Sequence, residues 1–162
     1  MKYRDYQLDI IKKGGGVLMQ HRFLYLAMEV RTGKTLTSLG IAASLGVNSV
    51  LFVTKKKAIS SIERDYDMLS PSFKIEVVNY ESLHKVKGEY NLIVLDEAHS
   101  MGAFPKPSKR AKQVKILIDK QNPFVILLSG TPTPESYSQM YHQVYACKNN
   151  PFKKHKSFYK FC

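Results

Sequence analysis

Short apolar runs alternate with amphipathic segments along most of this 162-residue chain. Each run is rich in branched or aromatic residues, is nearly continuously apolar, and has the length of one strand. Strands that are buried on both faces of a parallel sheet have this pattern. The five runs are FLYLA (23–27), SVLFVT (49–54), KIEVVNY (74–80), NLIVLD (91–96) and FVILLS (124–129).

Helical patterns lie before, between and after these runs. The first, RDYQLDIIKK, is expected to end at the helix-breaking triplet Gly14-Gly15-Gly16. The last, PESYSQMYHQVYAC, begins with a proline that suits a first helical turn. The others span 34–46, 58–69, 81–86 and 108–121. Strands that alternate with helices predict an α/β domain with right-handed crossovers.

The formal net charge of +12 adds a first indication of function. A compact domain this basic attracts polyanions, most often nucleic acid, although a merely solubilising surface is the alternative. The lysines are densest in KPSKRAKQVK and KNNPFKKHKSFYK. Since no repeat or linker divides the chain, we expect one domain over residues 1–147, followed by a basic tail or the start of a linker over 148–162.

Composition also argues against several other classes of protein. A hydrophobic content of 44% is that of a folded domain, and no apolar run approaches the roughly 20 residues of a membrane span. The polar N-terminus does not have the pattern of a signal peptide. The two cysteines, Cys147 and Cys162, are too far apart to suggest a disulfide framework or a zinc site. We therefore expect a cytoplasmic protein without a membrane partner.

The segment AMEVRTGKT (27–35) lies between the first apolar run and a helical pattern. A phosphate-binding loop needs this placement, because backbone N–H groups and the helix dipole then converge on phosphate. Gly33 would let the backbone approach the phosphates, Lys34 would reach the β- and γ-phosphates, and Thr35 would ligate Mg²⁺. Met28 stands where the usual pattern has its first glycine, so a chance GKT in an ordinary turn is the alternative.

A second candidate site follows the fourth apolar run, where NLIVLDEAHS places Asp96 and Glu97 directly after a strand. Beside a phosphate-binding loop, Asp96 can hold Mg²⁺, usually through water, and Glu97 can polarise the attacking water. Acidic residues after a strand can also simply start the next helix, but the strand–GKT–helix upstream favours the metal site. After the fifth run, the hydroxyl residues of SGTPTP could sense the γ-phosphate or build a turn before Pro132, and alone they favour the turn.

Taken together and in this order, these segments resemble the first motor domain of superfamily-2 helicases and translocases over nearly the whole chain. KYRDYQLD looks like the adenine-reading Q motif, with Gln7 as the matching glutamine. GKT, DEAH and SGT match motifs I, II and III, and FVTKKKAI and VVNYESL fall where motifs Ia and Ib occur. Within the superfamily the chain is most similar to remodeller-type and phage-encoded DNA-dependent ATPases, which implies a bacterial or, if phage-encoded, a host cytoplasm.

The resemblance implies a RecA-like P-loop NTPase fold, with three layers and a mainly parallel sheet in which the fifth run lies between the first and the fourth. It also implies that ATP and Mg²⁺ bind here and that DNA is the partner. The absent first glycine is common in this superfamily, so Met28 is no objection. Arg31 is unusual, and could add charge near the phosphates, face solvent or pair with Glu29. The implied residues are Gln7, Arg31, Thr32, Gly33, Lys34 and Thr35 for nucleotide, Thr35 and Asp96 for Mg²⁺, Lys34, Asp96 and Glu97 for catalysis, His99, Ser129 and Thr131 for coupling, and Thr54, Lys55, Lys56 and Lys57 for nucleic acid.

Motors of this superfamily need a second RecA-like domain that carries arginine fingers. After SGTPTP the chain has only a helical pattern and a basic tail, so that domain is expected in a downstream segment or a separate chain, unless it has been lost. Two hypotheses therefore stay open. The chain is either the ATP-binding half of a DNA-stimulated motor, or a helicase-like module that holds nucleic acid or a partner without turnover.

Overall fold

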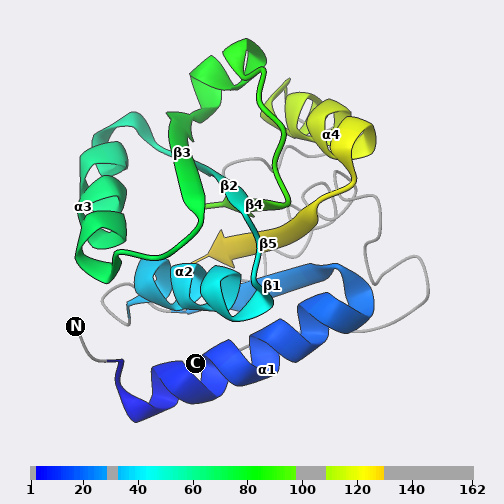
Figure 1. Ribbon diagram of the computed structural model, residues 1–162. Coiled ribbons are helices and arrows are strands. Elements are labelled where there is room, and N and C mark those ends of the chain that lie inside the picture. Colours follow the sequence, from blue (N-terminus) through cyan, green and yellow to red (C-terminus); the bar gives the residue numbers. More distant parts are fainter. Residues whose placement is uncertain (1–2, 29–32, 98–108, 130–162) are drawn as a thin grey trace.

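The computed structural model of the protein describes residues 3–28, 33–97 and 109–129. Within these ranges, parallel strands form one sheet in the order β1-β5-β4-β2-β3 (Figure 1). The strands are β1 (Phe23–Ala27), β2 (Ser49–Thr54), β3 (Lys74–Asn79), β4 (Leu92–Leu95) and β5 (Phe124–Ser129). They confirm the five predicted runs to within one residue at each end. β5 lies between β1 and β4, as the family resemblance implied.

Helices cover both faces of the sheet and make three layers (Figure 1). One face packs against α1 (Asp5–His21), α2 (Lys34–Leu45) and α3 (Ile59–Leu69). The other packs against the 3₁₀ helix η2 (Tyr80–Lys85) and α4 (Lys109–Gln121). A further 3₁₀ turn, η1 (Lys56–Ala58), follows β2. The predicted three-layer α/β fold is confirmed, although the segment at 81–86 forms a 3₁₀ helix.

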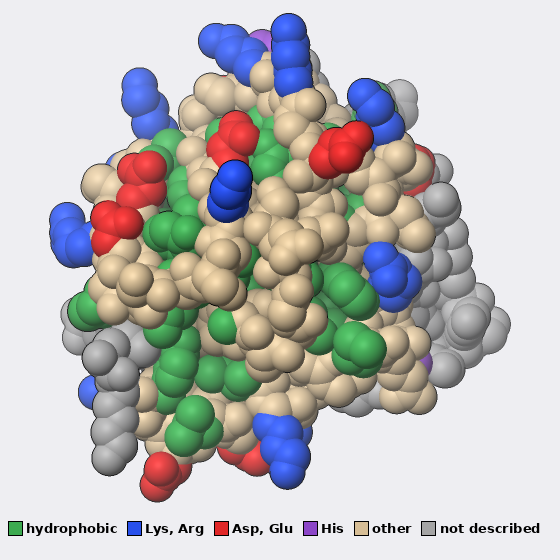
Figure 2. All heavy atoms as spheres, in the orientation of Figure 1, with side chains coloured by type: hydrophobic (Ala, Val, Ile, Leu, Met, Phe, Trp, Pro, Cys, Tyr) green, Lys and Arg blue, Asp and Glu red, His purple; other side chains and the backbone are tan. Residues whose placement is uncertain are grey.

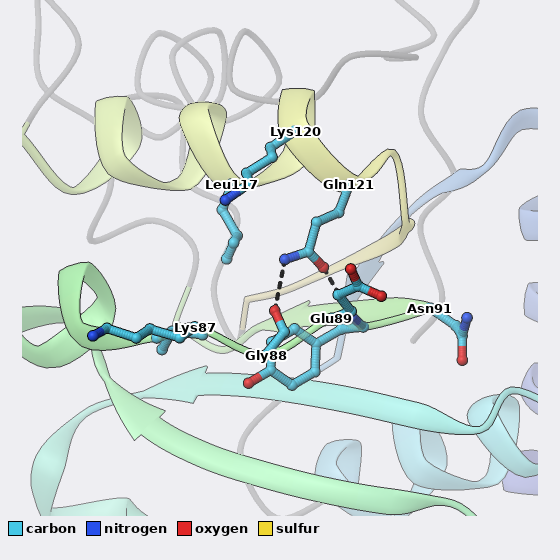
Figure 3. Close-up of a pocket in the computed structure, with 9 residues that line it drawn as sticks. Lys87, Gly88, Glu89, Asn91, Leu117, Lys120 and Gln121 are labelled. Atoms are coloured by element: carbon cyan, nitrogen blue, oxygen red, sulfur yellow. Dashed lines mark hydrogen bonds between the residues drawn. The ribbon is translucent and has the colours of Figure 1, made fainter.

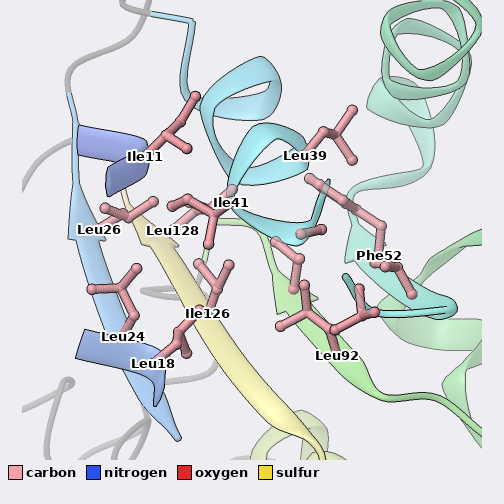
Figure 4. Packing of buried hydrophobic residues seen from close by; sticks show 14 of the residues in the cluster. Ile11, Leu18, Leu24, Leu26, Leu39, Ile41, Phe52, Leu92, Ile126 and Leu128 are labelled. Atoms are coloured by element: carbon pink, nitrogen blue, oxygen red, sulfur yellow. The ribbon is translucent and has the colours of Figure 1, made fainter. Parts of the chain in front are cut away.

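Alternate residues of each strand supply the two apolar cores, because successive side chains point to opposite faces of a sheet. In β2, Val50 and Phe52 face α1–α3, whereas Leu51 and Val53 face α4 and η2. Figure 4 shows the first core, in which leucines and isoleucines of β1, β5 and β4 meet those of α1 and α2. The nearly continuous apolar runs follow from this double coverage.

β3 departs from the prediction that every run is buried on both faces. It pairs only with β2 at the edge of the sheet, and Lys74 and Glu76 are exposed along it. The other edge strand, β1, is buried, so edge position alone does not explain this exposure. The two cores cover β3 only in part, because Ile75, Val77 and Val78 are partly buried, and charged residues are tolerated on such a strand.

The glycine triplet does not end α1, which continues to His21. Gly14 is buried, and a Cβ there would come within 2.9 Å of Ile41 and 3.0 Å of Leu24. From the facing helix, a Cβ on Gly40 would come within 2.5 Å of Ile11. These glycines let α1 approach α2 and the sheet, and this close packing outweighs their poor helix propensity. The helix ends instead at Arg22, which is left-handed with φ 61°.

The predicted last helix and the boundary at residue 147 lie outside the described residues. No helix within the described ranges is long and apolar enough to cross a membrane.

Two glycine substitutions test the packing of α1 on α2. Gly40→Ala adds a methyl group to the crowded contact with Ile11, whereas Gly16→Ala adds one where no atom lies within 4 Å. Both gain helix propensity, about 0.5–1 kcal/mol, so their difference isolates the packing term. We expect the free energy of unfolding of Gly40→Ala to be lower by about 1–3 kcal/mol than that of Gly16→Ala in urea denaturation. Equal stabilities would contradict the close helix contact.

Candidate active site

The GKT segment opens α2 directly after the loop that follows β1, as the sequence predicted. Gly33 precedes the helix with φ 75°, a left-handed conformation that glycine adopts without strain. Its carbonyl accepts the hydrogen bond from the N–H of Thr37, 2.9 Å away, which begins the helix. The first turn of such a helix leaves N–H groups without helical partners, which is the arrangement that binds phosphate.

Lys34 of the GKT segment contacts the carboxylates of Asp96 and Glu97. Its Nζ lies 2.9 Å from Glu97 Oε1 and 3.2 Å from Asp96 Oδ1, and its side chain is only 14% exposed. Burial opposes the charge of the ammonium group, but the attraction of Asp96 and Glu97 outweighs it, so the pKa of Lys34 is raised above its ordinary value. The three residues that the sequence assigned to catalysis therefore form one compact charged cluster.

Asp96 is held in place by hydrogen bonds from three directions. Its carboxylate accepts from the Thr54 hydroxyl at 2.7 Å and from the Glu97 N–H at 3.0 Å. Its carbonyl accepts from the Tyr80 hydroxyl at 2.6 Å. Since Asp96 is only 5% exposed, these contacts replace water and fix the orientation of the carboxylate. Sequence reasoning missed Tyr80, because its link to Asp96 depends on the strand order.

Thr54 differs from the lysines that follow it in its burial. The sequence placed it with the lysines that contact nucleic acid, but its side chain is fully buried and donates to Asp96. It is the last residue of β2, and β2 is hydrogen-bonded to β4, which precedes Asp96. The alternation of the strand turns this hydroxyl inward, and a contact of Thr54 with nucleic acid stays a prediction.

Gln7 lies against Gly33 of the candidate phosphate-binding segment, although it is 26 residues away in sequence. Its side chain is 5% exposed, its amide nitrogen is 3.5 Å from the Gly33 carbonyl, and its amide oxygen accepts from the Arg4 N–H at 2.9 Å. A Cβ at position 33 would collide with this amide, which is a second reason for glycine there. α1 thus brings Gln7 to the site, and recognition of adenine by Gln7 stays a prediction.

Lys55, Lys56 and Lys57 are exposed at the carboxyl end of β2. Together with Asn79 and Glu81 they line an open hollow of about 570 Å³. Asn79 donates to the Glu81 carboxylate at 3.0 Å, so the acidic group of the hollow is already engaged. Their binding to nucleic acid is untested and stays a prediction.

The other predicted residues lie in β5, in α2 or outside the described residues. Ser129 ends β5 opposite Ala27, at the carboxyl edge between β1 and β4. Thr35 lies in the first turn of α2, where its carbonyl accepts from the Ser38 hydroxyl at 2.8 Å. Arg31, Thr32, His99 and Thr131 lie outside the described residues.

The donor set fits Mg²⁺ better than a transition metal. Among the described residues, no three His, Cys, Asp or Glu side chains gather into a metal cage. Mg²⁺ needs none, because it usually binds through one or two carboxylates, water and substrate phosphates. Asp96, oriented and nearly buried beside Lys34, offers such a carboxylate.

A separate hollow of about 520 Å³ lies at the amino end of β4, between the preceding loop and α4 (Figure 3). Gln121 bridges it: its amide donates to the Gly88 carbonyl and accepts from the Tyr90 N–H, both at 2.8 Å. Asn91 accepts from the N–H groups of Asn48 and Ser49. These polar groups hold the loop to its neighbours, so the hollow has a structural explanation.

Charge is mixed over the face seen in Figure 2. Lys and Arg side chains are spread around it, with acidic side chains between them. The lysine-dense segment 148–160 lies outside the described residues, as does part of 106–115. The high net charge therefore does not by itself locate a nucleic-acid surface.

The chain matches the SNF2-related domain over residues 23–162, which is most of its length. It belongs to the SNF2-related domain family. This membership confirms the resemblance to the first RecA-like domain of superfamily-2 motors, a family of ATPase domains. No curated protein sequence matches the chain significantly.

Solved structures with a similar fold include an ATPase core domain and a helicase domain. The SWI2/SNF2 ATPase core domain of Sulfolobus solfataricus has a TM-score of 0.74 at 16% identity and covers 96% of this chain. The Hef helicase domain of Pyrococcus furiosus has a TM-score of 0.71 at 18% identity and covers 98%. The restriction-modification enzyme LlaGI, solved with a DNA substrate mimic, has a TM-score of 0.59 at 17% identity and covers 82%. At these identities the likeness shows the fold. The chain spans 40%, 38% and 18% of those three chains, respectively.

The structural explanation of the second hollow can be tested at Gln121. Gln121→Ala removes both hydrogen bonds that hold the loop at 88–90, so we expect the free energy of unfolding to fall by about 1–3 kcal/mol. Nucleotide affinity should not change, because this hollow lies at the amino end of β4, whereas the candidate active site lies at the carboxyl ends of the strands. Gln20→Ala, on an exposed position of α1, is the matched control and should be neutral. A stable Gln121→Ala protein with altered nucleotide affinity would contradict this explanation.

Proposed function

We propose that the chain is the ATP-binding motor domain of a superfamily-2 DNA helicase or translocase. In this proposal ATP hydrolysis is coupled to nucleic-acid binding and needs a second RecA-like domain. The observation that carries the proposal is the cluster at the N-terminus of α2, where the Lys34 ammonium lies 2.9–3.2 Å from the carboxylates of Glu97 and Asp96. Family membership and the RecA-like fold support it.

Each residue of the cluster would have a separate task. Gly33 and the first turn of α2 would receive the phosphates on backbone N–H groups, and Lys34 would leave the carboxylates to meet the β- and γ-phosphates. Asp96 and Thr35 would hold Mg²⁺, which would neutralise negative charge on the phosphates when bound. Glu97 would orient the attacking water and accept its proton. Until nucleotide binds, Lys34 keeps two adjacent carboxylates from repelling each other.

A second domain would supply what this cluster lacks. Phosphoryl transfer spreads negative charge over the γ-phosphate oxygens, and an arginine finger that meets it is worth about 10³–10⁵ in rate. Arg31 belongs to the loop itself. It would help to bind the ground-state nucleotide, but it is poorly placed to stabilise charge on the leaving side of the phosphate. Closure of two domains around ATP would also be needed to move nucleic acid. The greater length of the similar motor proteins supports this view, and the LlaGI complex supports DNA as the partner.

Lys34→Ala tests the nucleotide site. It removes the charge that would meet the phosphates, so we expect Mg²⁺–ATP affinity to fall by about 10- to 100-fold in titration calorimetry. Lys13→Ala, an exposed lysine of α1 paired with Asp9, should leave it unchanged. Glu97→Gln should keep binding and lose hydrolysis when the second domain is supplied. An unchanged affinity in folded Lys34→Ala would overturn the proposal. Turnover that stays absent with the second domain would favour the binding-module alternative.

Replacement of Lys55, Lys56 and Lys57 by alanine tests the nucleic-acid surface. Binding through phosphates releases counterions, so the slope of log K against log salt should flatten by about 0.9 for each duplex phosphate that the variant no longer neutralises. Alanine at Lys12, Lys13 and Lys74 changes the net charge equally but away from the carboxyl edge, and should leave the slope nearly unchanged. An unchanged slope in the first variant would move the surface elsewhere, for example to residues 148–160.

A further inference from the structure

Two buried hydroxyl groups connect Asp96 to neighbouring strands. Thr54, fully buried at the end of β2, donates to the Asp96 carboxylate at 2.7 Å. Tyr80, 1% exposed just after β3, donates to the Asp96 carbonyl at 2.6 Å. β2 lies between β4 and β3, so the tyrosine reaches past one strand to meet the end of another. One donor therefore fixes the side chain of Asp96 and the other fixes its backbone.

The residues next to these two hydroxyls in sequence form the basic hollow. Lys55 follows Thr54 directly, while Asn79 and Glu81 flank Tyr80. Lysines 55–57, Asn79 and Glu81 line this one hollow of about 570 Å³. Thr54 and Asn79 are also paired in the register of β2 and β3. One chain segment thus faces the surface with lysines and the other with Asn79 and Glu81, and both face the interior with a donor that holds Asp96.

We propose that Thr54 and Tyr80 are positioning residues that transmit the binding of a nucleic-acid phosphate backbone, at Lys55–Lys57 and Asn79, to the orientation of Asp96. This inference rests on the proposed function of the site. Three ammonium groups against one carboxylate, which Asn79 already engages, suit a polyanion. Such a ligand would fix the segments on either side of the hollow, and each is one residue away from a donor to Asp96.

Nucleic-acid binding is expected to strengthen Mg²⁺ binding, because it would fix the orientation of the Asp96 carboxylate. A carboxylate that must hold a metal ion binds it better when its orientation is fixed, and loss of such supporting hydrogen bonds typically costs about 10- to 100-fold in metal affinity. Phosphates bound at the hollow would restrain β2 and β3 at their ends and so favour the metal-holding orientation. Coupling between two sites is reciprocal, so Mg²⁺–nucleotide should also tighten nucleic-acid binding by the same factor.

Binding measurements on the full chain separate this role from a merely structural one. Thr54→Val and Tyr80→Phe each remove one donor and keep the shape of the side chain. Thr37→Val is a matched control, because Thr37 is fully buried and its hydroxyl has no partner among the described residues. Tyr66→Phe removes a tyrosine hydroxyl that donates to the Phe73 carbonyl, away from Asp96. Thr54→Ser keeps the donor and is the rescue variant.

Two ratios are measured for every variant with a fluorescent ATP analogue. The first is the gain in nucleotide affinity on adding Mg²⁺, and the second is the gain on adding duplex DNA in the presence of Mg²⁺. We expect Thr54→Val and Tyr80→Phe to reduce the first ratio by about 10-fold and to bring the second close to 1. Affinity without Mg²⁺ should stay at the wild-type value, since Lys34 is unchanged. Both controls and Thr54→Ser should behave as the wild type.

The outcomes distinguish the inference from the function on which it rests. If the wild type binds Mg²⁺–nucleotide and depends on Lys34, but both donor variants match their controls in both ratios, the inference is wrong and the proposed function stands. If DNA does not change nucleotide affinity in the wild type, transmission from the hollow is wrong. A wild type that binds no Mg²⁺–nucleotide overturns both. Should Thr54→Val not fold, Tyr80→Phe alone decides, because it removes only one oxygen atom.

Discussion

The parallel pairing of β1, β5, β4 and β2 determines where all the candidate chemistry of this protein lies. Parallel strands end at the same edge of a sheet, so segments that are far apart in sequence meet there. Through this pairing the candidate phosphate-binding segment after β1, the carboxylates after β4 and the lysines after β2 become neighbours. Ligands of open α/β sheets bind at such carboxyl ends, particularly where the strand order changes direction. The opposite edge holds loop-bracing contacts such as those of Gln121.

This arrangement depends on helices that cover both faces closely. α1 approaches α2 through Gly14 and Gly40, and the same contact brings Gln7 of α1 beside Gly33. Packing contacts in the middle of the helix therefore help to position a polar side chain near its N-terminus. Because protein interiors are close-packed, even one methyl group at Gly40 would have to displace Ile11.

Paired charges and hydrogen bonds stabilise the candidate active site. Lys34, Asp96 and Glu97 are partly or largely removed from water, where an unpaired charge is costly, and they satisfy one another. Thr54 and Tyr80 add hydrogen bonds to the carboxylate and the carbonyl of Asp96. A cluster whose charges are paired with one another can be stable without nucleotide. In the proposed function Lys34 would exchange its carboxylate partners for phosphate oxygens, which offer the ammonium group the same kind of interaction.

The sequence alone determined the strands, the fold class and the motifs, because burial on both faces, helical periodicity and the GKT and DEAH patterns are written in neighbouring residues. Even the place of β5 could be anticipated, but only through the family resemblance. Tertiary structure decided the rest. Gly14 is a packing position inside a helix because Ile41 and Leu24 lie against it. Thr54 faces Asp96, 42 positions away, because β2 lies beside β4. β3 is exposed because the two cores cover it only in part. Such roles depend on which segments the fold brings together and on how fully they cover one another, and neither is encoded in local pattern.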